Sequence, residues 1–365
     1  MTGGSETQPR SYSIALYGNY TPDALATSYE RAFQHAGHTV IRMDTRELNK
    51  YLSPWLTNRI AHRATIESFV LRKLGAQKWN HYLLMLTHET KPDMVLILKG
   101  DFLMPDTILH WQDLGLPVII FHPDNPFRPY PAHRPETLPN AKVATLYLIW
   151  SQSLLDRLTS GGVQRVKILS FAWDPEVHPY IASNNSDATT QVLFIGTWDR
   201  QRETLLTAIA RHYNLKVFGS KYWVERTHPK SPLRNCWQGG ELHGREAANA
   251  MRSASIVINV LREQNLPDGI NMRTFEAPGC GAFSLSNWSS GANVLLPDGG
   301  AGAYFHDVGD CLEKIDAYLT NTQERKDLAM NAHRIVKSQH TYKNRAHEII
   351  LMYEELRDNY ALGFR

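Results

Sequence analysis

A group of polar and ionisable residues follows one of the apolar runs of this chain. Asp268, Asn271, Arg273 and Glu276 come shortly after the strand-like run 256–261. A strand, a polar loop and a short helix are how α/β folds present chemistry at the carboxyl edge of a sheet. Arginine neutralises phosphate, and carboxylates accept hydrogen bonds from sugar hydroxyls. The group therefore predicts a phosphorylated, hydroxyl-rich ligand.

The spacing inside this group has two interpretations. Arg273 and Glu276 are three residues apart, which places both side chains on one face of a helix. Arg273 could neutralise a diphosphate while Glu276 binds ribose hydroxyls, or the two could form only a surface ion pair. Gly279 and Gly281 favour the first interpretation, because glycine allows a ligand to approach the backbone closely.

A second candidate is the glycine turn at Gly196 and Thr197. It follows the apolar run 191–195 and precedes a helical segment that begins at Arg200. A turn between a strand and a helix N-terminus can face a phosphate group. Arginine is unfavourable at a helix N-terminus unless an anion is present, so Arg200 supports this interpretation. A plain strand-to-helix turn is the alternative.

Three residues of the first half are candidates for a catalytic base. His122 closes the strand-like run 116–122, Asp124 follows it, and Asp101 follows the run 94–98. A histidine or aspartate at the end of a strand can accept the proton of an acceptor hydroxyl. A turn capped by an Asp or Asn side chain is the alternative at residues 122–125. The sequence leaves the base open among these three residues and others not named here.

Signatures of several other enzyme classes are absent. No GxGxxG follows the first strand and no GxxxxGK[ST] occurs, which disfavours nicotinamide-binding and P-loop enzymes. HExxH and GxSxG are also missing. There is no Asp-x-Asp triplet, with which some sugar transferases hold a divalent metal. No metal-ligating residues are therefore predicted, and the chemistry is expected to be metal-independent.

The composition is that of a globular protein. The chain has 365 residues, 42% apolar and 21% charged, with a formal net charge of +3 that does not indicate nucleic acid or an anionic membrane as partner. Its three cysteines lack CxxC spacing, which fits reduced thiols. The first residues are polar, and no apolar run reaches the roughly 20 residues of a membrane span. We therefore expect a cytoplasmic protein without a membrane span.

Strand and helix signals alternate along the whole chain, which predicts an α/β protein with parallel, doubly wound sheets. The expected strands cover residues 12–17, 38–43, 94–98, 116–122, 144–150, 166–169, 191–195, 215–218, 256–261 and 282–285. The expected helices cover residues 21–36, 55–75 and 78–88, a segment from Pro105, and residues 151–160, 200–211, 245–252, 311–319, 323–337 and 343–360.

Four segments resemble the GT-B glycosyltransferases, closest to the spore-maturation (CgeB-type) branch. They are residues 171–178, similar to an inter-domain crossing, and residues 192–202, 271–283 and 304–315. The resemblance covers about residues 165–345. It implies two doubly wound, Rossmann-like domains that face a central cleft. These are residues 1–172 on the acceptor side, residues 173–345 for the donor, and a C-terminal helix at 346–365 that packs back on the first domain.

The resemblance also assigns roles to the candidate residues. Glu276 would bind the ribose of a nucleotide-sugar donor, and Arg273 with the Gly196 turn would face its diphosphate. Asp268 falls where related transferases carry the first glutamate of a Glu-x7-Glu motif, which contacts the donor sugar. Aspartate is one methylene shorter, and this departure affects the sugar contact.

The predicted function is that of a hexosyltransferase-like glycosyltransferase. It would move a sugar from a nucleotide-diphosphate donor to a hydroxyl or similar nucleophile of a small molecule, glycan or protein, without a cofactor. Nucleic acid is not expected as a partner. Two alternatives stay open: a non-catalytic nucleotide- or sugar-binding relative, and a sugar-nucleotide epimerase of the same fold.

Overall fold

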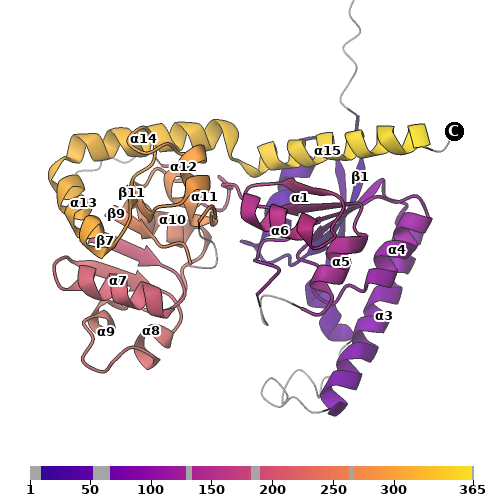
Figure 1. The fold of residues 1–365 in the computed structure, drawn as a ribbon, viewed down its shortest axis with the longest axis horizontal. Coiled ribbons are helices and arrows are strands. Elements are labelled where there is room, and N and C mark those ends of the chain that lie inside the picture. Colours follow the sequence, from indigo (N-terminus) through magenta and orange to yellow (C-terminus); the bar gives the residue numbers. More distant parts are fainter. Residues whose placement is uncertain (1–9, 52–65, 129–133, 182–189, 263–266, 364–365) are drawn as a thin grey trace, which may run out of the picture. The chain divides into compact units, whose positions relative to one another are not determined.

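The computed structural model describes two compact units, each with one parallel sheet (Figure 1). Unit 1 comprises Met1–Ile149, Leu154–Leu169 and Ala346–Arg365, and unit 2 comprises Trp150–Ser153 and Ser170–Arg345. The α/β fold predicted from the sequence is confirmed. The described residues are 10–51, 66–128, 134–181, 190–262 and 267–363.

Unit 1 contains a six-stranded parallel sheet in the order β2-β1-β3-β4-β5-β6. Its inner strands are continuous apolar runs that are buried on both faces, as is usual for parallel sheets covered by helices. The strands are β1 (Ser13–Gly18), β2 (Thr39–Asp44), β3 (Met94–Leu98), β4 (Val118–Phe121), β5 (Leu146–Ile149) and β6 (Val166–Ile168).

Helices connect these strands: α1 (Leu25–His35), the 3-10 helix η1 (Thr45–Lys50), α3 (Ile66–Thr90), α4 (Pro105–Asp113), α5 (Thr137–Val143) and α6 (Gln152–Ser160). Two sequence predictions were wrong here. The helices expected at 55–75 and 78–88 are, where described, the single helix α3, which continues through Gly75. Helix α1 begins at Leu25, because Thr21 to Ala24 form a turn closed by a 3.0 Å backbone hydrogen bond.

The last helix, α15 (Tyr342–Gly363), is assigned to unit 1 from Ala346 onward. Tyr12 next to β1 donates a 2.7 Å hydrogen bond to Glu354 and accepts one of 3.0 Å from Arg357. Lys167 on β6 pairs with Glu355 at 2.5 Å. Polar contacts therefore connect the end of the chain to two strands of the first sheet.

Unit 2 contains a five-stranded parallel sheet in the order β11-β10-β9-β7-β8. The strands are β7 (Thr190–Ile195), β8 (Leu215–Phe218), β9 (Ala254–Asn259), β10 (Ser284–Asn287) and β11 (Tyr304–Phe305). The helices are α7 (Arg200–Ala210), α8 (Tyr222–Glu225), α9 (Leu233–Cys236), α10 (Gly244–Arg252), α11 (Arg273–Gly279), α12 (Ser290–Leu295), α13 (Val308–Thr320) and α14 (Thr322–Gln339).

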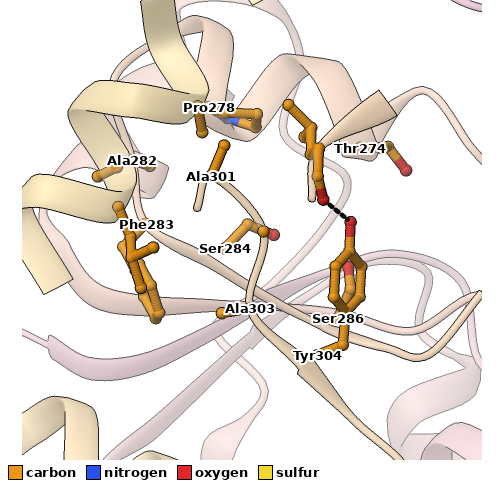
Figure 2. Close-up of a pocket in the computed structure, with 14 residues that line it drawn as sticks. Thr274, Pro278, Ala282, Phe283, Ser284, Ser286, Ala301, Ala303 and Tyr304 are labelled. Carbon is orange, nitrogen blue, oxygen red and sulfur yellow. Dashed lines mark hydrogen bonds between the residues drawn. The ribbon is translucent and has the colours of Figure 1, made fainter. Parts of the chain in front are cut away.

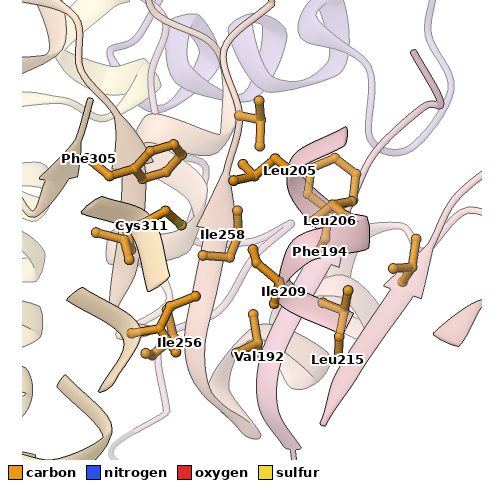
Figure 3. Close-up of a cluster of buried hydrophobic side chains, with 14 of the residues drawn as sticks. Val192, Phe194, Leu205, Leu206, Ile209, Leu215, Ile256, Ile258, Phe305 and Cys311 are labelled. Carbon is orange, nitrogen blue, oxygen red and sulfur yellow. The ribbon is translucent and has the colours of Figure 1, made fainter. Parts of the chain in front are cut away.

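Two hydrophobic clusters cover the two faces of this sheet. Because successive side chains of a strand point to opposite faces, Val192 and Phe194 of β7 join one cluster while Leu193 joins the other. The first cluster adds apolar residues of α7 and α13 (Figure 3), and the second adds residues of α10 and α11. Burying apolar side chains on both faces contributes about 1.5–3 kcal/mol for each large residue.

The two sheets share a topological feature that locates ligand sites. In each sheet the first strand lies between the second and the third, at β2-β1-β3 in unit 1 and β8-β7-β9 in unit 2. Successive connections leave such a point in opposite directions, and the crevice at the carboxyl ends of its strands is where doubly wound sheets bind ligands. We call the β1–β3 and β7–β9 positions the two switch points.

The segment expected to connect the domains is packed against unit 2 where it is described. Trp173 is buried, accepts a backbone hydrogen bond from Tyr342 and donates one to His340. The polar, proline-bearing residues 173–190 are predicted from the sequence to connect the domains, and residues 182–189 of them lie outside the described part of the chain. Among the described residues, no helix is both long and apolar enough to cross a membrane.

Candidate functional site

Two glycine turns form the base of the switch point in unit 2. Gly196 ends β7 and Gly219 ends β8, and a Cβ atom at Gly219 would lie 2.1 Å from the Gly196 carbonyl oxygen. The indole of Trp223 donates to that oxygen at 2.8 Å, and the indole of Trp237 donates to the Gly219 oxygen at 3.0 Å. The Gly196 N–H donates to Phe218 within the sheet. Gly196 therefore shapes the turn, and its own N–H is occupied.

A buried arginine holds this turn against the end of β9. Arg202 on α7 donates to the Thr197 carbonyl at 3.0 Å, the Thr197 hydroxyl at 3.2 Å and the Val260 carbonyl at 2.8 Å. Burial lowers its pKa to about 10, so the guanidinium stays charged at neutral pH. Asp199, which caps α7, lies 3.4 Å from the Arg202 Nε. Arg202 thus joins both strands of the switch point.

Arg262 is a residue of this site that the sequence analysis missed. It follows β9, donates a hydrogen bond to the Thr197 hydroxyl, and lies 3.8 Å from Asp199. Its side chain is 40% exposed, so it can reach a ligand. Its position as the first charged residue after β9 is the sequence feature that could have identified it as a site residue. Arg200, which was predicted, is 83% exposed and lies 3.5 Å from Glu203 on its own helix.

Helix α11 brings Arg273 and Glu276 together, as their spacing predicted. The Arg273 guanidinium lies 3.0 Å from the Glu276 carboxylate, and both side chains are largely buried, at 18% and 10% exposure. Arg273 also contacts the Met251 sulfur at 3.1 Å. The alternative of a solvated surface pair is therefore wrong. The partners offset each other's charge in a partly dehydrated environment.

Asn271 and Asp268 have defined partners within unit 2. Asn271 accepts a 3.0 Å hydrogen bond from the Thr274 N–H at the start of α11, and its amide donates to Asn259 on β9 at 2.8 Å. Asn271 therefore joins this helix to the strand. The Asp268 carboxylate accepts hydrogen bonds from Ser151 and Ser153 at 2.6–3.0 Å. Burial opposes ionisation of Asp268, but these bonds outweigh it and lower its pKa.

Gly279 and Gly281 are explained by packing inside the protein. A Cβ atom at Gly279 would lie 2.3 Å from the Trp173 ring, and one at Gly281 would lie 2.8 Å from the Tyr180 ring. His333 on α14 stacks on Tyr180 and its Nδ1 lies 2.9 Å from the Gly279 oxygen. Aromatic side chains therefore make the close approach that the sequence analysis had assigned to a ligand.

A small cavity lies behind α11, where Thr274, Ser284 and Ser286 contribute to its lining (Figure 2). Its volume of about 20 Å³ is enough for one water molecule and far too small for a sugar nucleotide. The buried Ser284 hydroxyl has no hydrogen-bond partner among the described residues. This cavity is therefore too small to be the binding site of such a ligand.

Unit 1 has a larger pocket at its own switch point. It has a volume of about 520 Å³ and is lined by residues that follow β1 and β3, together with parts of α1 and η1. Asn19, Asn49, Lys99 and Asp101 supply polar groups, and Phe102 an aromatic wall. This volume is in the range of pockets that bind small molecules.

Lys99 brings two of the predicted base candidates together. Its ammonium lies 3.0 Å from Asp124 and 3.6 Å from Asp101. Burial alone would lower the pKa of Lys99, but the two carboxylates outweigh it and raise the pKa. Lys99, Gly100 and Phe102 all have positive φ angles, of 73°, 84° and 66°. Such strain at non-glycine residues concentrates at functional sites.

The third base candidate, His122, is fully buried. Its Nδ1 lies 2.8 Å from the Asp124 carbonyl oxygen, and its ring stacks on Tyr147. Burial lowers its pKa, so the imidazole is neutral at pH 7. Its Nε2 has no partner among the described residues. Asp101, in contrast, contributes to the pocket lining.

Cysteine and metal chemistry add little to either switch point. Cys236, Cys280 and Cys311 are free thiols, and burial raises the pKa of Cys280 to about 11 and of Cys311 to about 12. Within the described ranges, no three His, Cys, Asp or Glu side chains gather as a metal-binding group. The positive charge found at these sites comes from arginine and lysine.

The sequence and the fold have known relatives. Residues 200–350 match the family model described as glycosyl transferase-like. None of the curated proteins matches the chain by sequence.

Solved structures resemble the chain over most of its length. Sucrose-phosphate synthase from Thermosynechococcus elongatus is 13% identical, with a TM-score of 0.68 over 95% of this chain and 100% of that one. HepE from Anabaena, in complex with UDP-glucose, is 13% identical, with a TM-score of 0.65 over 94% and 100%. α,α-Trehalose 6-phosphate synthase from Burkholderia multivorans is 11% identical, with a TM-score of 0.63 over 97% and 98%. Residues 200–350 are therefore similar in sequence to the glycosyl transferase-like family, and the chain has the GT-B fold of the solved glycosyltransferase structures.

Proposed function

We propose that this protein is a glycosyltransferase that moves a sugar from a nucleotide-diphosphate donor to an acceptor hydroxyl or similar nucleophile. The observation that supports this most is the switch point of unit 2. It joins the glycine turn just before residues 200–350, which match the glycosyl transferase-like model, to cationic side chains and to the Arg273–Glu276 helix within that match. HepE, of similar fold, was solved with UDP-glucose.

In this proposal unit 2 binds the donor. Glu276 accepts hydrogen bonds from the ribose hydroxyls, and Arg273, 3.0 Å away, orients its carboxylate. The bond between the anomeric carbon and the diphosphate oxygen breaks, and the diphosphate leaves with the electron pair. Positive groups aimed at those oxygens stabilise the charge that develops there. Arginine can supply that charge without a metal ion.

Unit 1 binds the acceptor. Its pocket of about 520 Å³ holds amide, ammonium and carboxylate groups beside an aromatic wall, which suits a hydroxyl-bearing molecule. As the acceptor oxygen bonds to the anomeric carbon, its proton passes to a base. Asp101 is the predicted base that lines the pocket, whereas Asp124 is paired with Lys99 and His122 is buried.

The finer assignments of this proposal come from sequence. Residues 271–283 support membership of the spore-maturation (CgeB-type) branch. Three free thiols fit the reducing environment of the cytoplasm.

A two-step assay tests the proposed function. Thermal unfolding with UDP, ADP, GDP, CDP and dTDP should raise the melting temperature for at least one, since a ligand that binds only the folded state stabilises it. The corresponding nucleotide sugars should then show release of the diphosphate, faster with an acceptor. Binding without release would identify a non-catalytic relative, and interconversion of the sugar would identify an epimerase. Binding of no nucleotide would contradict both the transferase and the epimerase.

Replacement of one side chain tests the assigned ribose contact. Glu276→Gln should weaken the nucleoside diphosphate about 10-fold to 100-fold, because a hydrogen bond to a charged group contributes about 1.5–3 kcal/mol. Its affinity for inorganic pyrophosphate, which has no ribose, should not change. Glu313→Gln, at an exposed position on α13, is the matched control. Equal affinity of the Glu276 variant and the wild type would refute the ribose contact.

A further inference from the structure

Arg262 is the residue of the unit 2 switch point to which the proposed function gives no task. Its guanidinium donates to the Thr197 hydroxyl, the same oxygen that accepts from the buried Arg202 at 3.2 Å. Two cations therefore converge on one neutral oxygen at the end of β7. Like charges this close repel each other, and the arrangement favours an anion beside them.

The charge balance at this point leaves an excess of positive charge. Asp199 is the carboxylate near both guanidinium groups, at 3.4 Å from Arg202 and 3.8 Å from Arg262. In the described part of the chain, two cations thus face one anion. Arg202 is only 8% exposed, and its Nε has no hydrogen-bond partner among the described residues. Its charge is poorly hydrated, so it raises the potential at the more exposed Arg262.

Arg273 differs in each of these respects. It is paired one to one with Glu276 at 3.0 Å, and its side chain is 18% exposed against 40% for Arg262. A phosphate that approached Arg273 would compete with a carboxylate already in place. Arg262 has a weaker competitor, since the nearest carboxylate among the described residues, that of Asp199, is 3.8 Å away. An arginine that is accessible, incompletely neutralised and supported by a second arginine suits a diphosphate.

We propose that Arg262 binds the diphosphate of the donor, and that Arg202 is a positioning residue that holds Thr197 and the end of β9 beneath it. This assignment rests on the proposed function, since it names the group that receives the leaving diphosphate at the same site. The guanidinium donates two hydrogen bonds to phosphate oxygens, and the bonds strengthen as those oxygens gain negative charge.

The test is calorimetric binding of inorganic pyrophosphate and of the five nucleoside diphosphates to the full chain. Arg262→Ala should bind pyrophosphate at least 10-fold more weakly than the wild type. Arg262→Lys should recover only part of the affinity, because an ammonium cannot make the paired hydrogen bonds of a guanidinium. Arg211→Ala removes the same charge from an exposed position at the other end of α7 and should bind within 2-fold of the wild type.

The outcomes separate this assignment from the proposed function. If the wild type binds a nucleoside diphosphate, and Arg262→Ala binds both this ligand and pyrophosphate with wild-type affinity, the assignment is wrong and the function stands. If the wild type binds a nucleoside diphosphate but not pyrophosphate, the assignment also fails. If the wild type binds no nucleoside diphosphate, the function itself fails. Unchanged melting temperatures of the variants would show that they are folded.

Discussion

The two switch points have the same strand order and different charge chemistry. In unit 1, the ammonium of Lys99 is enclosed by Asp101 and Asp124, and Arg134 lies 3.9 Å from Asp101, so that two cations face two carboxylates among the described residues. The fully buried group nearby is the neutral imidazole of His122. In unit 2, two arginines share one carboxylate, and the buried group is the charged Arg202. One topology thus supports a switch point with balanced charge and a switch point with excess positive charge.

This difference shows where specificity resides in such folds. The strand order determines where a ligand lies, because loops meet at the reversal of the sheet. The side chains on those loops determine which ligand it is. A diphosphate suits the positive switch point of unit 2, and a neutral, hydroxyl-bearing molecule suits the balanced one of unit 1.

The largest effect is expected from Gly219→Ala, which would disrupt only the unit 2 side of this comparison. The added Cβ would lie 2.1 Å from the Gly196 oxygen, so the two turns must separate. We expect a loss of about 3 kcal/mol in the free energy of unfolding and loss of nucleoside diphosphate binding. Urea denaturation and calorimetry measure the two.

Gly37→Ala is its matched control. Gly37 also has a positive φ, of 85°, but a Cβ there would meet nothing within 4 Å. Gly37→Ala should lower the free energy of unfolding by only about 1 kcal/mol and leave the nucleotide affinity unchanged. Equal losses in the two variants would mean that the approach of the Gly196 and Gly219 turns is unimportant.

A smaller effect is expected from acid, on the unit 1 side. Burial lowers the pKa of His122 below the value of about 6.5 in the unfolded chain. The unfolded state therefore takes up a proton first, and stability is lost as the pH falls below about 6.5, by at most about 1.4 kcal/mol per pH unit. His122→Asn should reduce this slope, measured by urea denaturation between pH 7.5 and 5. An unchanged slope would show that His122 does not titrate as its burial requires.

The smallest effect on stability is expected from Lys99→Met, which removes one cation of the balanced switch point. Lys99 is 30% exposed, so its ion pairs should contribute only about 0.5–1 kcal/mol. Sugar transfer to the acceptor should slow, while nucleoside diphosphate affinity stays within 2-fold of the wild type. Lys78→Met, exposed on α3, is the control. A lower nucleotide affinity for Lys99→Met, but not for Lys78→Met, would contradict the proposal that unit 2 binds the donor and unit 1 the acceptor.

Much of the fold could be predicted from the sequence, because buried parallel strands are continuous apolar runs. The bounds of β3 and β8 agree with the prediction residue for residue. The strand β11 was missed, since its two residues give no periodic signal. Helix α3 was divided in two at a glycine, although a helix tolerates glycine at a cost of about 1 kcal/mol.

The candidate site was less predictable, because its contacts join residues far apart in the sequence. The Arg273–Glu276 pair follows from local helix geometry, and the sequence indicated it. The meeting of Arg262 with Thr197 depends on β7 and β9 being neighbours, which local spacing does not reveal. The aromatic partners of Gly279 and Gly281 are likewise tertiary contacts.

The indoles of Trp223 and Trp237 donate to the backbone of the two glycine turns of unit 2, whereas the next residue of the first turn, Thr197, is exposed. The residues that hold the shape of the turns are therefore different from the exposed residues that would contact a ligand. During divergence, the exposed residues of the turn can be exchanged one at a time while the indoles keep its shape. A lineage can acquire a new substrate without passing through an unfolded ancestor, and the turn is a suitable target for directed evolution.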